Sequence, residues 1–245
     1  MKLVDVLQEC KVEGNVIKLP SAQLERKLYQ EVAKALELIG GKWKGGKTFG
    51  FVFPSDPTEL LAQISNGESR NLKKEFQFFE TPNKWADIIV AEAFNCTCIG
   101  RVLEPSAGRG SIIKAIHSID PDINVFYYEL MDINRTFLEK LINVTSLGKD
   151  FLTEPTDLKF SHIISNPPFS NNQDIDHIRH MYELLKEGGR LVSFTSPHWK
   201  IATGKKETQF RQWLEEVEAD EWNIPAGEFK ESGTSIATCI VIIDK

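Results

Sequence analysis

The chain of 245 residues is poor in cysteine, and its cysteines do not form a recognisable metal-binding or disulfide pattern. The four are Cys10, Cys96, Cys98 and Cys239. Only one residue separates Cys96 from Cys98, which is too close for a zinc knuckle, and no second pair accompanies them. We therefore expect reduced thiols, as in a cytoplasmic protein.

Long apolar runs and an excess of positive charge are also missing. No run approaches the ~20 residues that a membrane helix needs, and the N-terminal residues lack the pattern of a signal peptide. The formal net charge is −6, which argues against a protein that coats nucleic acid but still allows a local basic face. His177 and His180 share one face of an expected helix, but with no third ligand no metal site is predicted.

Strand and helix patterns alternate from Phe76 to the C-terminus. Strands are expected at 101–103, 124–128, directly before 149, 161–165, 190–195 and 236–243. Helices are expected at 81–94, 111–117, 132–143, 176–186 and 209–217, with Gly188-Gly189 ending the fourth. This alternation predicts a mostly parallel sheet with helices on both faces. We assign residues 76–245 to this domain.

Residues 1–75 predict a separate, small α+β unit. A short strand is expected at 14–19, and a helix from Pro20-Ser21 to the Gly-Gly stop at 40–41. Residues 42–53 read as a hairpin with Gly-Gly at its turn, and 57–64 as a short helix.

The most informative stretch is Asn166-Pro167-Pro168-Phe169, directly after an apolar strand. Neither proline can donate a ladder hydrogen bond, so the strand must stop there. Proline also holds Asn166 extended. The Asn166 side-chain oxygen and the Pro167 carbonyl can then accept hydrogen bonds from one amino group, while Phe169 offers a flat apolar face to a planar ring. This tip suits a substrate with a planar nitrogen.

Other polar residues follow the neighbouring strands. Ligands of such sheets bind outside the carboxyl ends of the strands. The loop from Glu104 to Gly110 lacks the third glycine of a dinucleotide loop, and the Glu104 carboxylate would repel a pyrophosphate. A cationic ligand such as S-adenosylmethionine fits better. Glu129 at the next tip is placed to bind ribose hydroxyls, and Asp150 with Phe151 to bind an adenine ring.

Taken in order, these motifs resemble those of the amino-methylating DNA adenine methyltransferases, in the gamma arrangement. The matching segments are Phe79-Glu80-Thr81-Pro82, 103–110, Tyr128-Glu129, 149–152, 165–169, 186–194 and 233–239. The resemblance implies a Rossmann-like class I methyltransferase fold, with a mostly parallel seven-stranded sheet whose last strand is antiparallel, beside the small N-terminal unit. It also implies site-specific methyl transfer from S-adenosylmethionine to the amino group of adenine in double-stranded DNA, with the target base flipped out of the duplex.

The resemblance assigns roles to residues at the matching positions. Catalysis falls to Asn166, Pro167, Pro168 and Phe169. Cofactor binding falls to Phe79, Thr81, Glu104, Ser106, Gly108, Gly110, Glu129, Asp150, Phe151 and Asn166. The target base would pack on Phe169 and on Phe229, which precedes the last strand.

In the family a target-recognition region usually follows the catalytic domain, but here the chain ends after the last strand. Residues 1–75 hold 12 Lys+Arg and 10 Asp+Glu, a balance of +2, which leaves −8 for residues 76–245. We therefore expect the N-terminal unit to contact DNA phosphates, or a separate partner to supply specificity. The alternative is that the unit only packs on the catalytic domain and that its lysines are solvated. The expected contacts are Lys42, Lys44 and Lys47 of the hairpin and the cluster Arg70, Lys73 and Lys74.

Three alternatives stay open on sequence grounds. An RNA guanine or adenine methyltransferase and a release-factor glutamine methyltransferase use the same kind of strand tip on other planar nitrogens. The release-factor enzymes usually carry Tyr in place of Phe169 and an all-helical N-terminal region, whereas residues 1–75 show strand patterns. A non-catalytic module that keeps only the fold is the third alternative.

Overall fold

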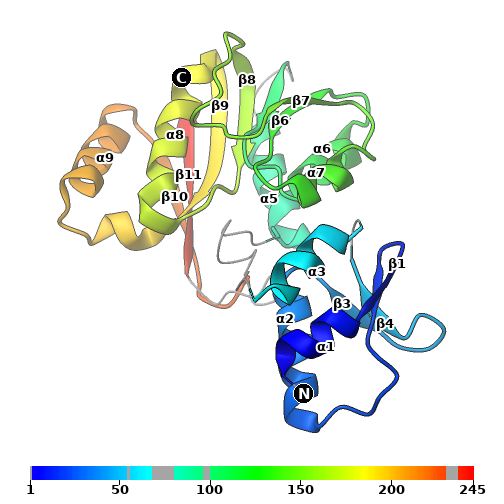
Figure 1. Cartoon of the computed structure of the whole chain (residues 1–245). Coiled ribbons are helices and arrows are strands. Elements are labelled where there is room, and N and C mark those ends of the chain that lie inside the picture. Colours follow the sequence, from blue (N-terminus) through cyan, green and yellow to red (C-terminus); the bar gives the residue numbers. More distant parts are fainter. Residues whose placement is uncertain (1, 54–55, 68–79, 96–99, 230–236) are drawn as a thin grey trace. The chain divides into compact units, whose positions relative to one another are not determined.

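The computed structural model describes residues 2–53, 56–67, 80–95, 100–229 and 237–245 (Figure 1). The chain divides into two compact units, Met1–Phe78 and Phe79–Lys245, which are described separately below. Phe79 and the basic cluster Arg70, Lys73 and Lys74 lie outside the described residues. None of the helices in the described ranges has the length and apolar character that crossing a membrane requires.

The N-terminal unit contains a four-stranded antiparallel sheet in the order β1-β2-β4-β3. Its elements are α1 (Leu3–Glu9), β1 (Lys11–Glu13), β2 (Val16–Lys18), α2 (Arg26–Leu38), β3 (Lys42–Lys44), β4 (Gly50–Val52) and α3 (Thr58–Ser65). The predicted hairpin is confirmed, since Trp43 of β3 pairs with Phe51 of β4. Helix α1 and strand β1 were not predicted.

The start of helix α2 differs from the prediction. The helix begins at Arg26 rather than at Pro20-Ser21, and Glu25 before it is extended. The fully buried positions of the helix are Val32 and Leu36, which lie in its middle and last turns. Residues 20–25 bury no side chain completely, so no packing energy offsets the cost of ordering an extra helical turn.

The second unit is a seven-stranded sheet in the order β10-β11-β9-β8-β5-β6-β7. Its strands are β5 (Val102–Glu104), β6 (Val125–Tyr128), β7 (Val144–Gly148), β8 (Phe160–Ser165), β9 (Leu185–Thr195), β10 (Asp220–Ile224) and β11 (Thr238–Asp244). Strands β5 to β9 are parallel, and β11 pairs antiparallel with both β9 and β10. The predicted fold class is therefore confirmed.

Helices cover both faces of this sheet (Figure 1). On one face α5 (Asn83–Phe94), α6 (Ser111–Ile119) and α7 (Asp132–Leu138) pack in one apolar cluster. On the other face α8 (Gln173–Leu184) and α9 (Lys205–Glu216) pack in a second cluster. Two short 3-10 turns, Ser170–Asn172 and Pro197–Lys200, follow strands β8 and β9.

Three predictions in this unit were wrong in detail. Helix α7 ends at Leu138, five residues early, and β10 was missed. Gly188-Gly189 does not end a helix but lies within β9. Gly188 has φ +73°, and a Cβ on Gly189 would lie 2.9 Å from the carbonyl oxygen of Ser161. The glycines therefore allow an irregularity where the β8–β9 register shifts.

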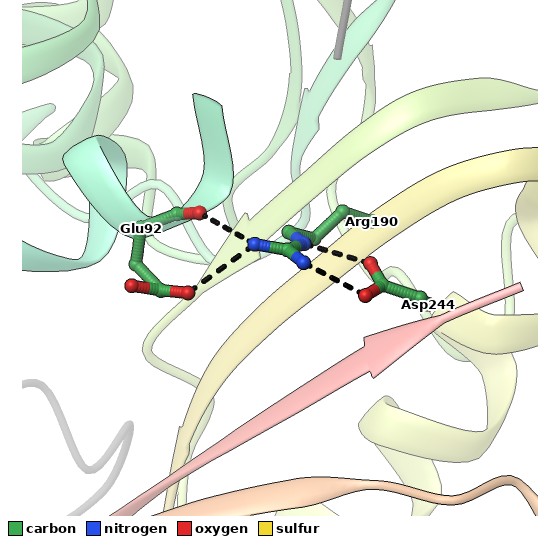
Figure 2. Close-up of polar contacts among 3 residues, drawn as sticks. All are labelled: Glu92, Arg190 and Asp244. Atoms are coloured by element: carbon green, nitrogen blue, oxygen red, sulfur yellow. Dashed lines mark hydrogen bonds and ion pairs between the residues drawn. The ribbon is translucent and has the colours of Figure 1, made fainter. Parts of the chain in front are cut away.

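Arg190 of β9 ties helix α5 to the last strand (Figure 2). Its Nε and Nη2 donate to the two carboxylate oxygens of Asp244, each at 2.7 Å. Its Nη1 donates to the carbonyl oxygen and the carboxylate of Glu92, both at 3.2 Å. The guanidinium lowers the pKa of the Asp244 carboxyl.

Candidate active site

The parallel strands bring the predicted polar tips to one edge of the sheet. Strand β5 ends on Glu104, and β6, β7 and β8 end directly before or near Glu129, Asp150 and Asn166. Because β5 lies between β6 and β8, the Glu104 tip lies centrally among the four. Neighbouring parallel strands end on the same side, so side chains far apart in sequence share one site.

Glu104 is buried without a full set of hydrogen-bond partners. Its side chain is 2% exposed, and among the described residues none donates a hydrogen bond to Oε2. The backbone N–H of Ile113 bonds to the carboxylate. Burial, reinforced by the nearby Glu129 charge, raises the pKa of Glu104 well above its usual value. A buried carboxylate with a free oxygen favours binding of a cation.

Glu129 organises the loop that follows β5. Its Oε2 accepts from the N–H of Gly108 at 2.7 Å, and its Oε1 accepts from the N–H of Met131 at 2.8 Å. Asn134 donates to the same Oε1 at 3.2 Å and accepts from Nε of Arg109 at 3.4 Å. Burial raises the pKa of Glu129, while these hydrogen bonds oppose the rise. Each oxygen retains acceptor capacity, and ribose binding stays a prediction.

Asn134 and Arg109 are parts of this network that sequence reasoning missed. Asn134 is fully buried, in the helix that follows the second tip. The polar atoms of a buried amide need hydrogen-bond partners. The sequence around Asn134, two positions after Asp132, did not indicate that this side chain is buried.

Two glycines give the loop its path. Gly108 has φ +55° and Gly110 has φ +79°, a region that other residues rarely adopt. A Cβ on Gly110 would also lie 2.9 Å from Cδ1 of Leu141. Beside them, Ser106 Oγ lies 3.5 Å from Nδ1 of His177, so the loop also touches helix α8.

Asp150 and Phe151 follow the third tip, but Phe151 is a core residue. Asp150 is half-buried, and its Oδ1 accepts from the N–H of Leu152 at 3.0 Å. The Phe151 ring is 2% exposed and packs on Tyr128, His177 and His180, with centroids 4.7 to 5.4 Å apart. These packing interactions do not test the predicted contact of Phe151 with an adenine ring, which stays a prediction.

His177 is a buried, uncharged part of the wall behind Phe151. Burial lowers its pKa to about 4, so the imidazole is neutral at physiological pH. Within the described ranges, no three His, Cys, Asp or Glu side chains are grouped closely enough to hold a metal ion.

The Asn-Pro-Pro-Phe motif and the Thr81-Pro82 motif meet, although 85 residues separate Thr81 from Asn166. Nδ2 of Asn166 donates to Oγ1 of Thr81 at 3.0 Å. Among the described residues no donor reaches Oδ1 of Asn166, so that oxygen is left to accept a hydrogen bond from another group. Pro167 is buried, and Phe169 is half-buried against the apolar core.

The turn after this tip is held by contacts that the sequence did not reveal. Asn171 and Asn172 both adopt left-handed conformations, with φ of +54° and +57°. Asn172 donates to Glu207 of α9 at 2.7 Å. Buried Asp174 accepts from Oγ1 of Thr195 at 2.6 Å, which joins the start of α8 to the end of β9. Hydrogen bonds to α9 and to the end of β9 therefore hold the turn that follows the tip.

Phe229 and the hairpin lysines are the other residues to which the sequence assigned substrate binding. Phe229 is 3% exposed, stacked on Trp85 at 6.5 Å and edge-on to Phe194. A contact with a target base would require the ring to leave this packing, and that role stays a prediction. Lys42, Lys44 and Lys47 are exposed on the N-terminal unit, and their contact with DNA stays a prediction.

Comparison with known proteins finds similarity in structure alone. No family model matches the chain, and no curated protein matches its sequence. The methyltransferase subunit of a type I restriction-modification system from Streptococcus thermophilus aligns over 68% of this chain and 44% of its own, with 22% identity and a TM-score of 0.60. The chain thus spans less than half of that subunit.

Two further structures align over more of their own length. A candidate class I S-adenosylmethionine-dependent methyltransferase from Listeria monocytogenes has a TM-score of 0.54 and 12% identity, over 77% of this chain and 66% of that one. A candidate RNA methyltransferase from Pyrococcus horikoshii has a TM-score of 0.51 and 16% identity, over 88% and 98%. This chain has the fold of the class I S-adenosylmethionine-dependent methyltransferases.

Proposed function

We propose that the protein transfers a methyl group from S-adenosylmethionine to the exocyclic amino group of adenine in DNA. The observation that carries this proposal is the Asn166–Thr81 hydrogen bond. It joins the Asn-Pro-Pro-Phe tip to the segment before α5 and leaves Oδ1 of Asn166 free to accept from an amino group.

The cofactor supplies a methyl group on a positively charged sulfonium. The residues of this chain fit such a ligand, because the unpaired Oε2 of buried Glu104 can accept from its ammonium group. The left-handed Gly108 and Gly110 allow close approach of the backbone. We assign the methionine part to Thr81 and Glu104, together with Ser106 in the loop that follows β5. The ribose falls to Glu129 and the adenine to Asp150 and Phe151.

Asn166 and Pro167 would act on the amine of the target base. The amine is a poor nucleophile because its lone pair is delocalised into the ring. Hydrogen bonds to Oδ1 of Asn166 and the carbonyl of Pro167 would favour a pyramidal nitrogen whose lone pair faces the methyl group. Pro168 keeps the tip rigid, and Phe169 would stack on the flipped base. Alignment of the reacting atoms, rather than a strong base, carries the rate.

DNA is the substrate that the observations favour. The Streptococcus protein of the same fold is a subunit of a restriction-modification system, and the motif order resembles DNA adenine enzymes. RNA is the second candidate, since the Pyrococcus protein is described as an RNA methyltransferase. A separate partner that supplies sequence specificity belongs to the proposal, because the Streptococcus protein of the same fold is one subunit of a restriction-modification system.

Methyl incorporation from labelled cofactor tests the assignment. We expect Asn166→Ala to reduce transfer to unmethylated DNA by about 10²-fold or more, since misplaced reacting groups cost that much. Asn166→Asp keeps an acceptor at the same position and should retain measurable transfer. Asn124→Ala, at an exposed position beside β7, is the matched control and should match wild type.

Parallel substrates distinguish the alternatives. Equal transfer by wild type and Asn166→Ala would contradict the proposal. Transfer to RNA or to release factor, with none to DNA, would reassign the substrate. Absence of calorimetric heat with S-adenosylmethionine at high protein concentration would favour a non-catalytic module.

A further inference from the structure

The N-terminal unit holds a groove of about 660 Å³ that the proposed catalytic site does not use. This volume falls within the ~300–1,000 Å³ typical of small-molecule sites. One wall is the extended segment between β2 and α2, where the sequence predicted a helix. The other wall is the β3–β4 hairpin, and both walls belong to the same unit.

Three aromatic side chains give this groove its character. Tyr29, Trp43 and Phe49 line it, and they are 37%, 38% and 69% exposed. Trp43 touches Tyr29 and Phe49 edge-on, at interplanar angles of 83° and 72°. Because neither pair is stacked face to face, a further planar ring can be added to the cluster by stacking.

Phe49 is held at this place at a conformational cost. Its φ is +37°, in the left-handed region where a bulky residue is a strong outlier. The neighbouring Gly50 pairs closely with β2, since a Cβ there would lie 2.8 Å from the carbonyl oxygen of Ile17. The tight strand contact thus fixes the backbone next to an exposed aromatic ring.

The charge of the groove is positive. Lys18 and Lys47 line it, and among the described lining residues none is Asp or Glu. Lys18 is paired with Glu13 at 2.7 Å. Within the described part of the unit, no carboxylate forms an ion pair with Lys47. Lys42 and Lys44 are exposed on the same hairpin. The occupant should therefore be planar, apolar on its faces and negatively charged beside the ring.

We propose that this groove binds an unpaired nucleobase of a single DNA strand, with the base stacked on the Phe49–Trp43 cluster and its phosphate beside Lys47. Sequence-tolerant binding of single strands combines aromatic stacking with lysine contacts to the backbone. Thr48 and Gln23 in the lining can bond to base edges. The choice of DNA over RNA rests on the proposed function; the stacking site does not.

Fluorescence anisotropy with the full chain and no cofactor tests this inference. The probes are a labelled DNA strand of about ten nucleotides, within the range of known site sizes, and an abasic strand of equal length. Wild type should bind the base-bearing strand more tightly. Phe49→Gly removes the ring and suits the left-handed backbone, and it should weaken that binding roughly 5- to 150-fold, the scale of one lost stacking contact.

Two variants complete the test. Lys47→Gln should weaken binding of both strands alike, because it removes only a phosphate contact. Trp222→Ala is the matched control, since Trp222 is 42% exposed on β10 of the other unit. It should leave both affinities unchanged.

Equal wild-type affinity for the two strands, or an unaltered Phe49→Gly, would overturn the proposal. So would binding of a leucine-rich peptide in the groove with no binding of either strand, which would assign it to protein docking. These outcomes are independent of methyl transfer. If the chain methylates DNA but binds both strands equally, only the groove proposal is refuted. If it prefers the base-bearing strand but transfers no methyl group, only the proposed function is refuted.

Discussion

The strand-tip edge of the large unit buries carboxylates, whereas the small unit exposes lysines and aromatic rings. Glu104 and Glu129 are buried, and burial raises the pKa of both carboxyl groups. Lys42 and Lys44 lie on an exposed strand of the hairpin. A buried acid attracts one cation strongly because water does not screen it, whereas exposed lysines provide weaker, salt-dependent contacts. The two units are thus suited to different ligands, a small cation and an extended polyanion.

The largest effect is expected at Glu104. Glu104→Gln should weaken S-adenosylmethionine binding by about 2–5 kcal/mol, the cost of losing one partner of a buried charge pair. Calorimetry measures it. The neutral-sulfur analogue S-adenosylhomocysteine keeps the ammonium and should lose a similar amount. An unchanged affinity for both ligands would remove Glu104 from the site.

The same residue should make cofactor binding pH-dependent. Because burial raises the pKa of Glu104 well above its usual value, the carboxyl of the ligand-free protein takes up its proton at a higher pH than an exposed glutamate does. Wild-type affinity should therefore rise with pH through that raised pKa, and Glu104→Gln should show a flatter profile. Parallel profiles for the two proteins would contradict this assignment.

Stability of the ligand-free protein should change with pH in the opposite direction. The folded-state pKa of Glu104 is higher than the unfolded one, so its favourable contribution is complete below the unfolded pKa and is lost as the pH rises through the folded pKa. Thermal melts from mild acid to neutral pH should show a larger loss in wild type than in Glu104→Gln.

A smaller effect is expected at Glu129. Glu129→Ala should weaken cofactor binding by about 1–3 kcal/mol, the scale of hydrogen bonds to a charged group. Asn134→Ala removes a neighbouring loop contact but keeps the carboxylate, so it separates loop disorder from lost ribose contacts. If Glu129→Ala binds the cofactor as wild type does, Glu129 does not hold the ribose.

The hairpin should affect the strand-tip site least. Neutralising Lys42, Lys44 and Lys47 to Gln should weaken DNA binding and reduce its salt dependence by up to about three phosphate contacts. S-adenosylmethionine affinity should be unaltered.

Three exposed lysines of the same unit but outside the hairpin provide the control, Lys11, Lys27 and Lys34. Neutralising them should leave the salt dependence near wild type. Wild-type affinity and salt slope in the hairpin variant would favour a partner subunit as the DNA-binding element.

The sheet and its tips were predictable because local signals agree there. The tips at Glu104, Glu129 and Asn166 lie at the ends of largely buried strands. The two prolines after Asn166 end their strand for a reason contained in the sequence. Sequence reasoning failed where distant contacts decide the conformation. The irregularity at Gly188 and Gly189 depends on packing against strand β8, which no local pattern records. Helix α2 begins late because residues 20–25 bury no side chain completely, and the sequence pattern did not reveal this.

Buried polar residues were the other failure. Asp174 and Asn134 are buried, but their partners, Thr195 and Glu129, come from other elements. An acid one position before Ile175, in an otherwise apolar helical face, was the available signal for Asp174, and it also fits an ordinary first-turn acid.

Helix α5 is fixed at both ends, and this has a mechanical consequence. Thr81, just before the helix, bonds to Asn166, while Glu92 near its other end is held by Arg190. About ten helical residues, or roughly 15 Å, separate these points. A stiff helix transmits a shift along its axis, so loosening Arg190 should displace Thr81 and misalign Asn166 at a distance. Arg190→Leu should then lose methyl transfer at a temperature below its own melting point. In wild type, loss of activity and unfolding should occur at the same temperature.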